Sequence, residues 1–265
     1  MDTPITGLIT NDYEIQCIEK IKKYIEEYKN LFFIDDSKTL HKFERNLPFD
    51  VKNAVNWIKY GKIKKMLENV EPNNNVNCIT PMNELYVSCI GAEGSDKVLE
   101  TMHIDGPFHL LPFCKVLRII IAIQGNRSIY TDFPMNHKSY NLLTYEFIAF
   151  DYNRDIHYIF KNEDNFDAND RIILKLHYII TPRFLPYFIV ELYKQLHINY
   201  NSIVRTLFLK SQTENKYLSF VINNGTVIYC QFFHHIGYWN LFMILCSICK
   251  LYGLLSFSKN NLNCN

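Results

Sequence analysis

The chain has no strong excess of charge of either sign, with 28 Lys and Arg against 27 Asp and Glu among 265 residues. A nucleic-acid-binding domain usually carries a clear basic excess, so the composition indicates no nucleic-acid partner. Glycine and proline are few, nine of each, whereas hydrophobic residues reach 48% and aromatic residues 15%. This apolar content excludes intrinsic disorder over most of the chain.

The eight cysteines are scattered, and no pair of CxxC motifs predicts a zinc knuckle. The lone CxxC, Cys246 and Cys249, lies in an apolar run, where two small buried side chains are a simpler interpretation than a redox pair. Residues 1–10 lack the basic and then apolar run of a signal peptide. We therefore expect reduced thiols and a location on the cytoplasmic side.

Helical periodicity marks the first third of the chain. Apolar residues at 15, 18, 21, 25 and 28 predict a helix over 12–30, with Asn11 or Asp12 as its cap. A short strand is predicted at 31–34 and a second amphipathic helix over 50–70. A loop at 73–75 then separates an N-terminal helical layer, residues 1–75, from the rest of the chain.

From residue 85 the pattern changes to short β-branched runs separated by polar turns. With no helices between them, such runs predict an antiparallel sandwich or barrel and an α+β fold class for the whole chain. We assign residues 76–183 to this core. The predicted strands are 85–90, 116–123, 128–130, 145–150, 156–160 and 172–180.

The last unit, residues 184–265, is apolar. A helix is predicted over 185–208, and 236–257 is almost uninterrupted by polar residues. That length meets the ~20 residues of a membrane span, but Lys250 inside it would cost about 2.5–3.5 kcal/mol near the bilayer centre. Two alternatives stay open: an apolar helical tail packed on the 185–208 helix, or membrane attachment through 236–257 with 217–233 as a second arm. The sequence slightly favours the membrane.

Three residues in the core have the spacing of a metal site. His103 and Asp105 are two positions apart, so in an extended segment their side chains point to the same side. His157 follows Asp105 by 52 residues within a predicted strand, and Arg171 opens the next strand. Two imidazoles and one carboxylate are a typical ligand set for ferrous iron with open positions.

This arrangement resembles the Fe(II)/2-oxoglutarate-dependent dioxygenases, whose pattern is HxD, some fifty residues, a distal His, and then Arg or Lys on the next strand. Residues 128–134, SIYTDFP, are similar to the GG-x-T-x-FP segment of prolyl-hydroxylase-like members without its glycines. Residues 150–157 and 169–174 are similar to the aspartyl/asparaginyl β-hydroxylase branch. The resemblance covers about residues 84–182.

The resemblance implies a double-stranded β-helix (jelly-roll, cupin-like) core with His103, Asp105 and His157 as catalytic iron ligands. It implies that Arg171 binds the distal carboxylate of the co-substrate 2-oxoglutarate, since a guanidinium pairs with a carboxylate through two parallel hydrogen bonds. The implied reaction with O₂ hydroxylates a C–H bond of an undetermined protein, lipid or small-molecule substrate and releases succinate and CO₂.

Other interpretations of the same residues stay open. His157 on an apolar strand could be a core histidine, and Arg171 could simply begin a strand. His109 and His177 are rival ligands, and Arg118 is the next candidate for the co-substrate. The alternatives for the whole chain are a non-catalytic cupin-like binding domain and a membrane-associated structural protein.

Overall fold

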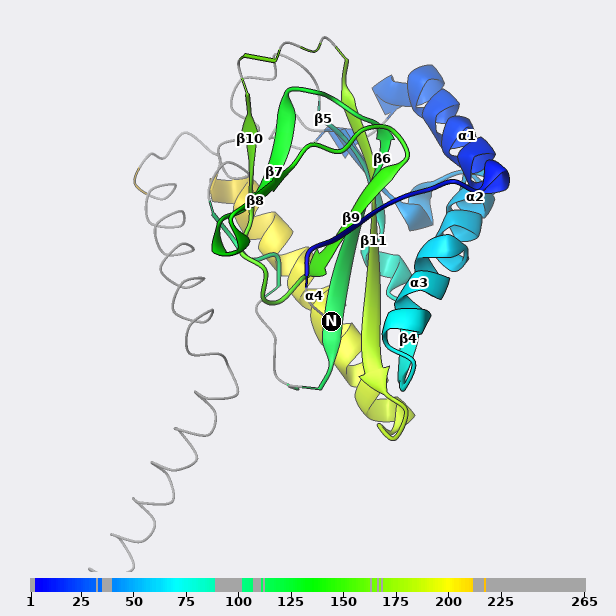
Figure 1. The fold of residues 1–265 in the computed structure, drawn as a ribbon, viewed down its shortest axis with the longest axis vertical. Helices are drawn as coiled ribbons and strands as arrows, with labels where there is room; N and C mark the ends of the chain where they lie inside the picture. Colours follow the sequence, from blue (N-terminus) through cyan, green and yellow to red (C-terminus); the bar gives the residue numbers. More distant parts are fainter. Residues whose placement is uncertain are drawn as a thin grey trace, which may run out of the picture.

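The computed structural model describes residues 3–31, 33–34, 40–88, 102–106, 111, 113–162, 164–165, 167, 169–211 and 217. The predicted membrane segments at 217–233 and 236–257, and also His109, lie outside these residues except for Tyr217. Figure 1 shows the elements, in chain order: β1 Ile5–Leu8, α1 Asp12–Tyr28, β2 Phe33–Ile34, β3 Leu40–Phe43, α2 Phe49–Tyr60, α3 Lys62–Val70, β4 Asn74–Cys78, β5 Glu84–Ser88, β6 Lys115–Gln124, β7 Ile129–Phe133, β8 Lys138–Tyr140, β9 Glu146–Asp151, β10 Tyr158–Lys161, β11 Arg171–Pro182 and α4 Tyr187–Ser211.

Two antiparallel sheets form the core. The large sheet has the order β1-β9-β6-β11-β5-β3-β2, with β4 also paired to β11, and the small sheet has the order β10-β7-β8. An isolated antiparallel bridge joins His103 to His157, the residue before β10, so the segment with His103 lies beside the small sheet. From β5 to β11 the chain passes back and forth between β5-β11-β6-β9 and this small sheet. That connectivity is a double-stranded β-helix, so the predicted jelly-roll core is confirmed for the part of the chain that the structure describes.

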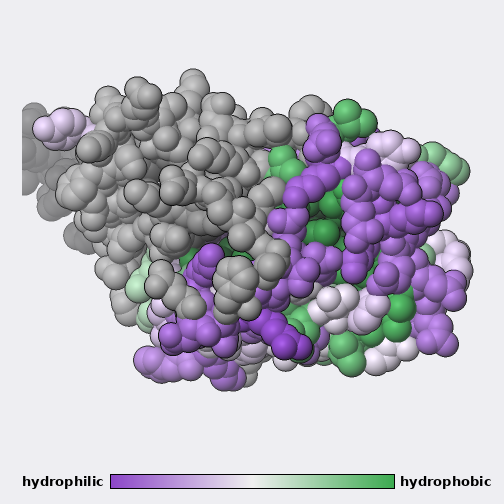
Figure 2. Space-filling model, turned by 90° about the horizontal axis from the view of Figure 1, so that it is seen from above, coloured by the Kyte–Doolittle hydropathy of each residue, from purple (hydrophilic) through white to green (hydrophobic). Residues whose placement is uncertain are grey.

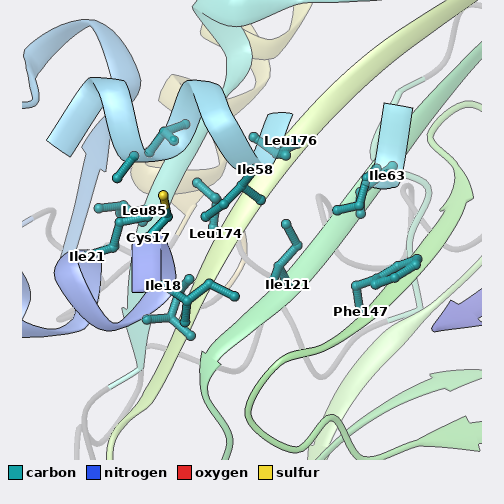
Figure 3. Close-up of a cluster of buried hydrophobic side chains, with 14 of the residues drawn as sticks. Cys17, Ile18, Ile21, Ile58, Ile63, Leu85, Ile121, Phe147, Leu174 and Leu176 are labelled. Carbon is teal, nitrogen blue, oxygen red and sulfur yellow. The ribbon is translucent and has the colours of Figure 1, made fainter. Parts of the chain in front are cut away.

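One face of the large sheet packs on α1, α2 and α3, which lie side by side in Figure 1. On β6 the odd-numbered residues from Leu117 to Ile123 face the helices, and on β11 the even-numbered ones do, because side chains alternate along a strand. Ile18 and Ile21 of α1 meet them (Figure 3), and Ile25 belongs to the same cluster. All three side chains are at most 1% exposed. Each such side chain contributes about 1.5–3 kcal/mol by burial.

The even-numbered residues of β6 and the odd-numbered residues of β11 face the space between the two sheets. Part of this interior is apolar, and β6 and β11 also place four basic side chains in it. Arg118 comes from β6, whereas Arg171, Lys175 and His177 come from β11. The apolar members are Tyr86, Ile120, Ala122, Phe133, Leu142, Ile148, Phe150 and Ile173.

The predicted helix over 50–70 is two helices, and this prediction was wrong at Gly61. A Cβ at Gly61 would lie 1.8 Å from Oε1 of Glu14, whose carboxylate reaches over from α1. Oε1 of Glu14 also accepts a hydrogen bond of 2.7 Å from the backbone N–H of Lys62, the first residue of α3. The break therefore depends on a contact with a distant helix, which amphipathic periodicity does not reveal.

The other predicted elements that fall on described residues are found within a few residues, and four of the described strands were missed. The predicted loop at 73–75 runs into β4, a polar strand that pairs with the end of β11. Strands β1, β3 and β8 were also missed. The layer predicted for residues 1–75 contains the three helices, and its strands β1 and β3 pair with β9 and β5 of the large sheet. The boundaries of the three predicted units stay a prediction.

The described surface is mostly hydrophilic in the view of Figure 2, with apolar side chains in small groups. Helix α4 confirms the helix predicted over 185–208. Among the helices that the structure describes, none has both the length and the apolar character needed to cross a membrane.

Candidate active site

His103 and His157 lie directly opposite each other on neighbouring antiparallel segments. Each donates its backbone N–H to the other's carbonyl oxygen at 3.0 Å. Directly opposed residues in an antiparallel pair place their side chains on the same face. The two rings accordingly lie close together, with centroids 4.5 Å apart.

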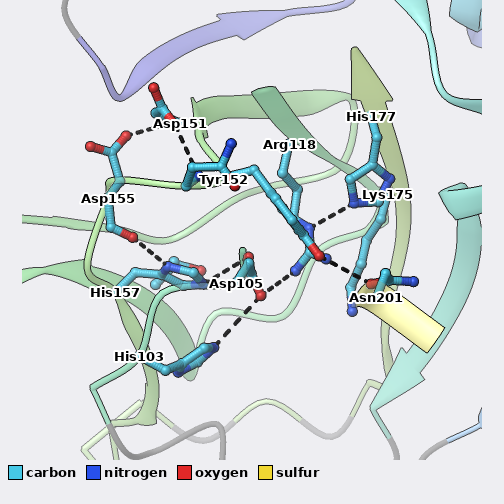
Figure 4. A network of polar contacts seen from close by, with 12 residues as sticks. His103, Asp105, Arg118, Asp151, Tyr152, Asp155, His157, Lys175, His177 and Asn201 are labelled. Carbon is cyan, nitrogen blue, oxygen red and sulfur yellow. Dashed lines mark hydrogen bonds and ion pairs between the residues drawn. The ribbon is translucent and has the colours of Figure 1, made fainter. Parts of the chain in front are cut away.

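Asp105 brings its carboxylate to the same place because it follows His103 by two residues (Figure 4). Oδ2 of Asp105 lies 3.4 Å from Nε2 of His157, and Oδ1 lies 3.9 Å from Nε2 of His103. One possible ligand atom from each of the three residues lies within 4.8 Å of the others. The structure thus brings together the three residues that the sequence predicts as metal ligands.

The hydrogen bonding of His157 shows which ring atom faces Asp105. Its Nδ1 lies 3.1 Å from the backbone oxygen of Asp155, and a carbonyl oxygen can only accept, so Nδ1 carries the proton. In the neutral ring Nε2 then has a lone pair directed at Oδ2 of Asp105. That oxygen is buried and has no hydrogen-bond partner among the described residues. Two lone-pair atoms face each other here, an arrangement that a cation between them would satisfy.

The protonation states of His157 and Asp105 at neutral pH suit metal binding. Burial lowers the pKa of His157 to about 4, against the smaller opposing influence of the Asp105 charge. Burial alone would raise the pKa of Asp105, but Arg118 and then His157 and His103 hold it well below its usual range. His157 is therefore neutral and Asp105 ionised, as metal ligation requires.

Arg118 is the nearest partner of this carboxylate, although on the sequence alone it was only the second candidate for the co-substrate. Its Nη1 lies 2.6 Å from Oδ1 of Asp105, and its Nε donates to Nε2 of His177 at 3.0 Å. The guanidinium lies over the ring of Tyr152, 4.8 Å from its centroid. The only sequence signal for this role was a basic residue at an inward-facing position of an apolar strand.

His177, a rival ligand on the sequence alone, lies beyond Arg118 and does not join the His–Asp–His cluster. It is fully buried, and burial followed by the Arg118 charge keeps its pKa well below the usual value. It therefore accepts the hydrogen bond of Arg118 as a neutral ring. Lys175, two residues before it on β11, forms an ion pair of 3.1 Å with Glu84.

Arg171 begins β11 and points into the space between the sheets. It is only 2% exposed, and its Nη2 lies 3.4 Å from Oγ1 of Thr131 on the small sheet. Thr131 pairs with Ile159, which lies two residues after His157 in the chain. The guanidinium thus reaches the small sheet close to the His–Asp–His cluster, as expected of a co-substrate anchor.

Helix α4 supports the site from behind Tyr152. The Tyr152 hydroxyl lies 3.2 Å from Oδ1 of Asn201. His197, which is fully buried, accepts from Nδ2 of Asn153 at 3.0 Å and donates from Nδ1 to the carbonyl oxygen of Tyr193. Tyr152 and Asn153, which directly follow β9, are therefore held by a helix from outside the predicted core.

Fold and site together define a double-stranded β-helix protein with a buried His–Asp–His cluster between its sheets. No protein-family model and no curated protein matches the chain. Among solved structures, the chain is similar to the viral collagen prolyl hydroxylase from Paramecium bursaria Chlorella virus-1 in its 2OG complex, at 14% identity over 68% of this chain and 95% of that one, with a TM-score of 0.46.

Two further solved structures show a comparable likeness. One is a prolyl hydroxylase from Trichoplax adhaerens in complex with a hypoxia inducible factor peptide, at 9% identity over 66% of this chain and 82% of that one, with a TM-score of 0.43. The other is the epimerase SnoN with Fe3+, alpha ketoglutarate and a nogalamycin, at 9% identity over 69% and 83%, with a TM-score of 0.45. These are oxygenases of the superfamily that the sequence resembles.

Proposed function

We propose that the chain is an Fe(II)- and 2-oxoglutarate-dependent oxygenase that hydroxylates a C–H bond of a protein, lipid or small molecule. The observation that carries the proposal is the pair of facing lone-pair atoms, Nε2 of His157 and Oδ2 of Asp105, 3.4 Å apart with His103 beside them. Neutral imidazole and ionised carboxylate are the donor types that a ferrous ion binds in a two-His-one-carboxylate site.

In this proposal each residue has one task. His103, Asp105 and His157 hold the iron, and Asp155 orients His157 through its carbonyl oxygen. Arg171 binds the distal carboxylate of 2-oxoglutarate, with the Thr131 hydroxyl beside its Nη2. Bound iron, with 2-oxoglutarate and O₂, supplies the oxidation that hydroxylates the substrate and releases succinate and CO₂.

An anaerobic titration of the purified full chain with Fe(II) and 2-oxoglutarate tests the proposal. We expect a weak visible charge-transfer band when both are present and none when either is omitted. Asp105→Ala should abolish the band while the circular dichroism spectrum is kept. Asp164→Ala, at an exposed position, is the matched control and should keep the band.

The outcomes separate the proposal from the alternative of a cupin-like binding domain. Admission of O₂ to the ternary complex should yield succinate from 2-oxoglutarate, which mass spectrometry detects. Metal binding without any succinate would favour the non-catalytic domain. A wild-type protein that binds neither metal nor 2-oxoglutarate would contradict both.

A further inference from the structure

Arg118 occupies a position that the proposed ligand roles do not explain. Arg118 is buried, with 8% of its surface exposed. Its Nη1 forms an ion pair with Oδ1 of Asp105, a carboxylate that is also a proposed metal ligand. The hydrogen bond to His177 and the ring of Tyr152 hold its guanidinium in place (Figure 4).

The two carboxylates beside this site, Asp105 and Glu84, each have a cationic partner before any ligand arrives. Arg118 offsets Asp105 at 2.6 Å, and Lys175 offsets Glu84 at 3.1 Å. A divalent cation would therefore add two uncompensated positive charges to a buried region, next to a guanidinium that cannot lose its own charge. A dianion bound beside the cation would restore the balance.

We propose that Arg118 makes metal binding depend on the binding of the anionic co-substrate, a property that rests on the proposed function of the site. Arg118 weakens the hold of the three ligands on a divalent metal alone. The two negative charges of 2-oxoglutarate remove this penalty, so metal and co-substrate bind as a pair. Arg118 is in this sense a positioning and coupling residue, because it acts through Asp105.

The proposal predicts a change in metal affinity opposite in direction to the change that a purely structural role of Arg118 would cause. Loss of a residue that merely orders Asp105 would weaken metal binding. Loss of the Arg118 charge should instead strengthen the binding of metal alone. Because coupling is reciprocal, it should also shrink the factor by which 2-oxoglutarate improves metal affinity.

Calorimetric titration with Co(II), a redox-stable substitute for Fe(II), measures both quantities on the full chain at pH 8. We expect Arg118→Gln to bind Co(II) about tenfold more tightly than wild type when 2-oxoglutarate is absent, since the repulsion between charges a few ångströms apart is lost. Arg118→Lys keeps the charge and should bind Co(II) alone as wild type does. Arg183→Gln makes the same change at an exposed position beyond β11 and should alter nothing.

An Arg118→Gln protein that is folded by circular dichroism, yet binds Co(II) as weakly as wild type or more weakly, would overturn the proposal. If that variant does not fold, the test is a Co(II) titration of the wild-type protein with and without glutarate. Glutarate keeps both negative charges of 2-oxoglutarate but lacks the 2-oxo group used in chelation. Glutarate should raise the Co(II) affinity severalfold, and no change would overturn the coupling. A wild-type chain that binds no Co(II) even with 2-oxoglutarate would instead refute the proposed function itself.

Discussion

Gly106 leaves the space in which the Tyr152 ring lies against the site. A Cβ at this position would lie 2.1 Å from Cε1 of Tyr152 and 2.6 Å from Oδ1 of Asn153. We predict that Gly106→Ala lowers the free energy of unfolding by about 1–3 kcal/mol through overpacking, measured by urea denaturation. The added methyl group also displaces the ring under Arg118. Tyr152→Leu in the same chain should recover part of the loss, and strict additivity of the two changes would contradict the contact.

Asp151 is a buried carboxyl whose protonation should make stability depend on pH. Burial raises its pKa from 3.8 to about 7. The native state therefore keeps a proton that the unfolded chain has released. The stabilisation is complete below about pH 4 and is lost as the pH rises through 7.

The substitution Asp151→Asn tests this sign. The amide keeps an oxygen for the backbone N–H of Asn153, which Asp151 accepts at 2.9 Å, and it cannot ionise. We predict that the unfolding free energy of wild type falls between pH 5 and pH 8 relative to that of the variant, by urea denaturation at both pH values. Parallel pH profiles of the two proteins would show that Asp151 does not cause the dependence.

Arg171 tests the co-substrate assignment. Lysine at this position keeps the charge but loses the planar fork that pairs with both oxygens of a carboxylate. We predict that Arg171→Lys raises the Kd for 2-oxoglutarate roughly tenfold, which is about 1.4 kcal/mol, in anaerobic titrations of the Fe(II)-loaded protein. Binding of Co(II) alone should change little. An unaltered 2-oxoglutarate affinity would remove Arg171 from the site and make Arg118 the next candidate.

Helix α4 lies outside the predicted core in sequence but packs against it in the structure. One of its faces packs on the interior side of the large sheet, where Val190 and Tyr193 meet Val116, Tyr152 and Ile179. The neighbouring Leu192 is 70% exposed. The helix thus covers the large sheet at residues close to Arg118 and His177 in the chain.

We predict that Tyr193→Ala lowers the free energy of unfolding by about 3 kcal/mol, because it leaves a cavity against β6 and β11. Leu192→Ala is the matched control on the same turn of the helix and should cost less than about 0.5 kcal/mol. Thermal or urea unfolding of both variants gives the comparison. Equal losses from the two substitutions would mean that α4 does not pack on the core through this face.

At the scale of the whole molecule, the membrane attachment predicted for 236–257 stays a prediction. A chain ending at residue 211 keeps every helix and strand that the structure describes. We expect the full chain to sediment with membranes and the shorter chain to remain in the supernatant, as measured by fractionation without detergent. Recovery of both chains in the supernatant would contradict membrane attachment.

Periodicity predicted most of the elements correctly because it is a local property. The helix α1 has its apolar residues on one face, and Asn11 caps it by accepting from the backbone N–H groups of Tyr13 and Glu14. The long strands β6 and β11 were predictable from their β-branched runs. The break at Gly61 and the polar strand β4 were not, since each depends on a partner far away in the sequence.

The sequence by itself determined that His103 and Asp105 point to one side, because their two-residue spacing acts within a single extended segment. Only the tertiary structure decided that His157 lies opposite His103 and that Arg118 lies beside His177, at directly paired positions. Strand register is set by the burial of whole faces, and a slip of one residue would turn every side chain to the other side. The position of the Arg118 charge beside Asp105 therefore depends on the pairing of β6 with β11, which brings Arg118 next to His177, 59 residues away in the chain.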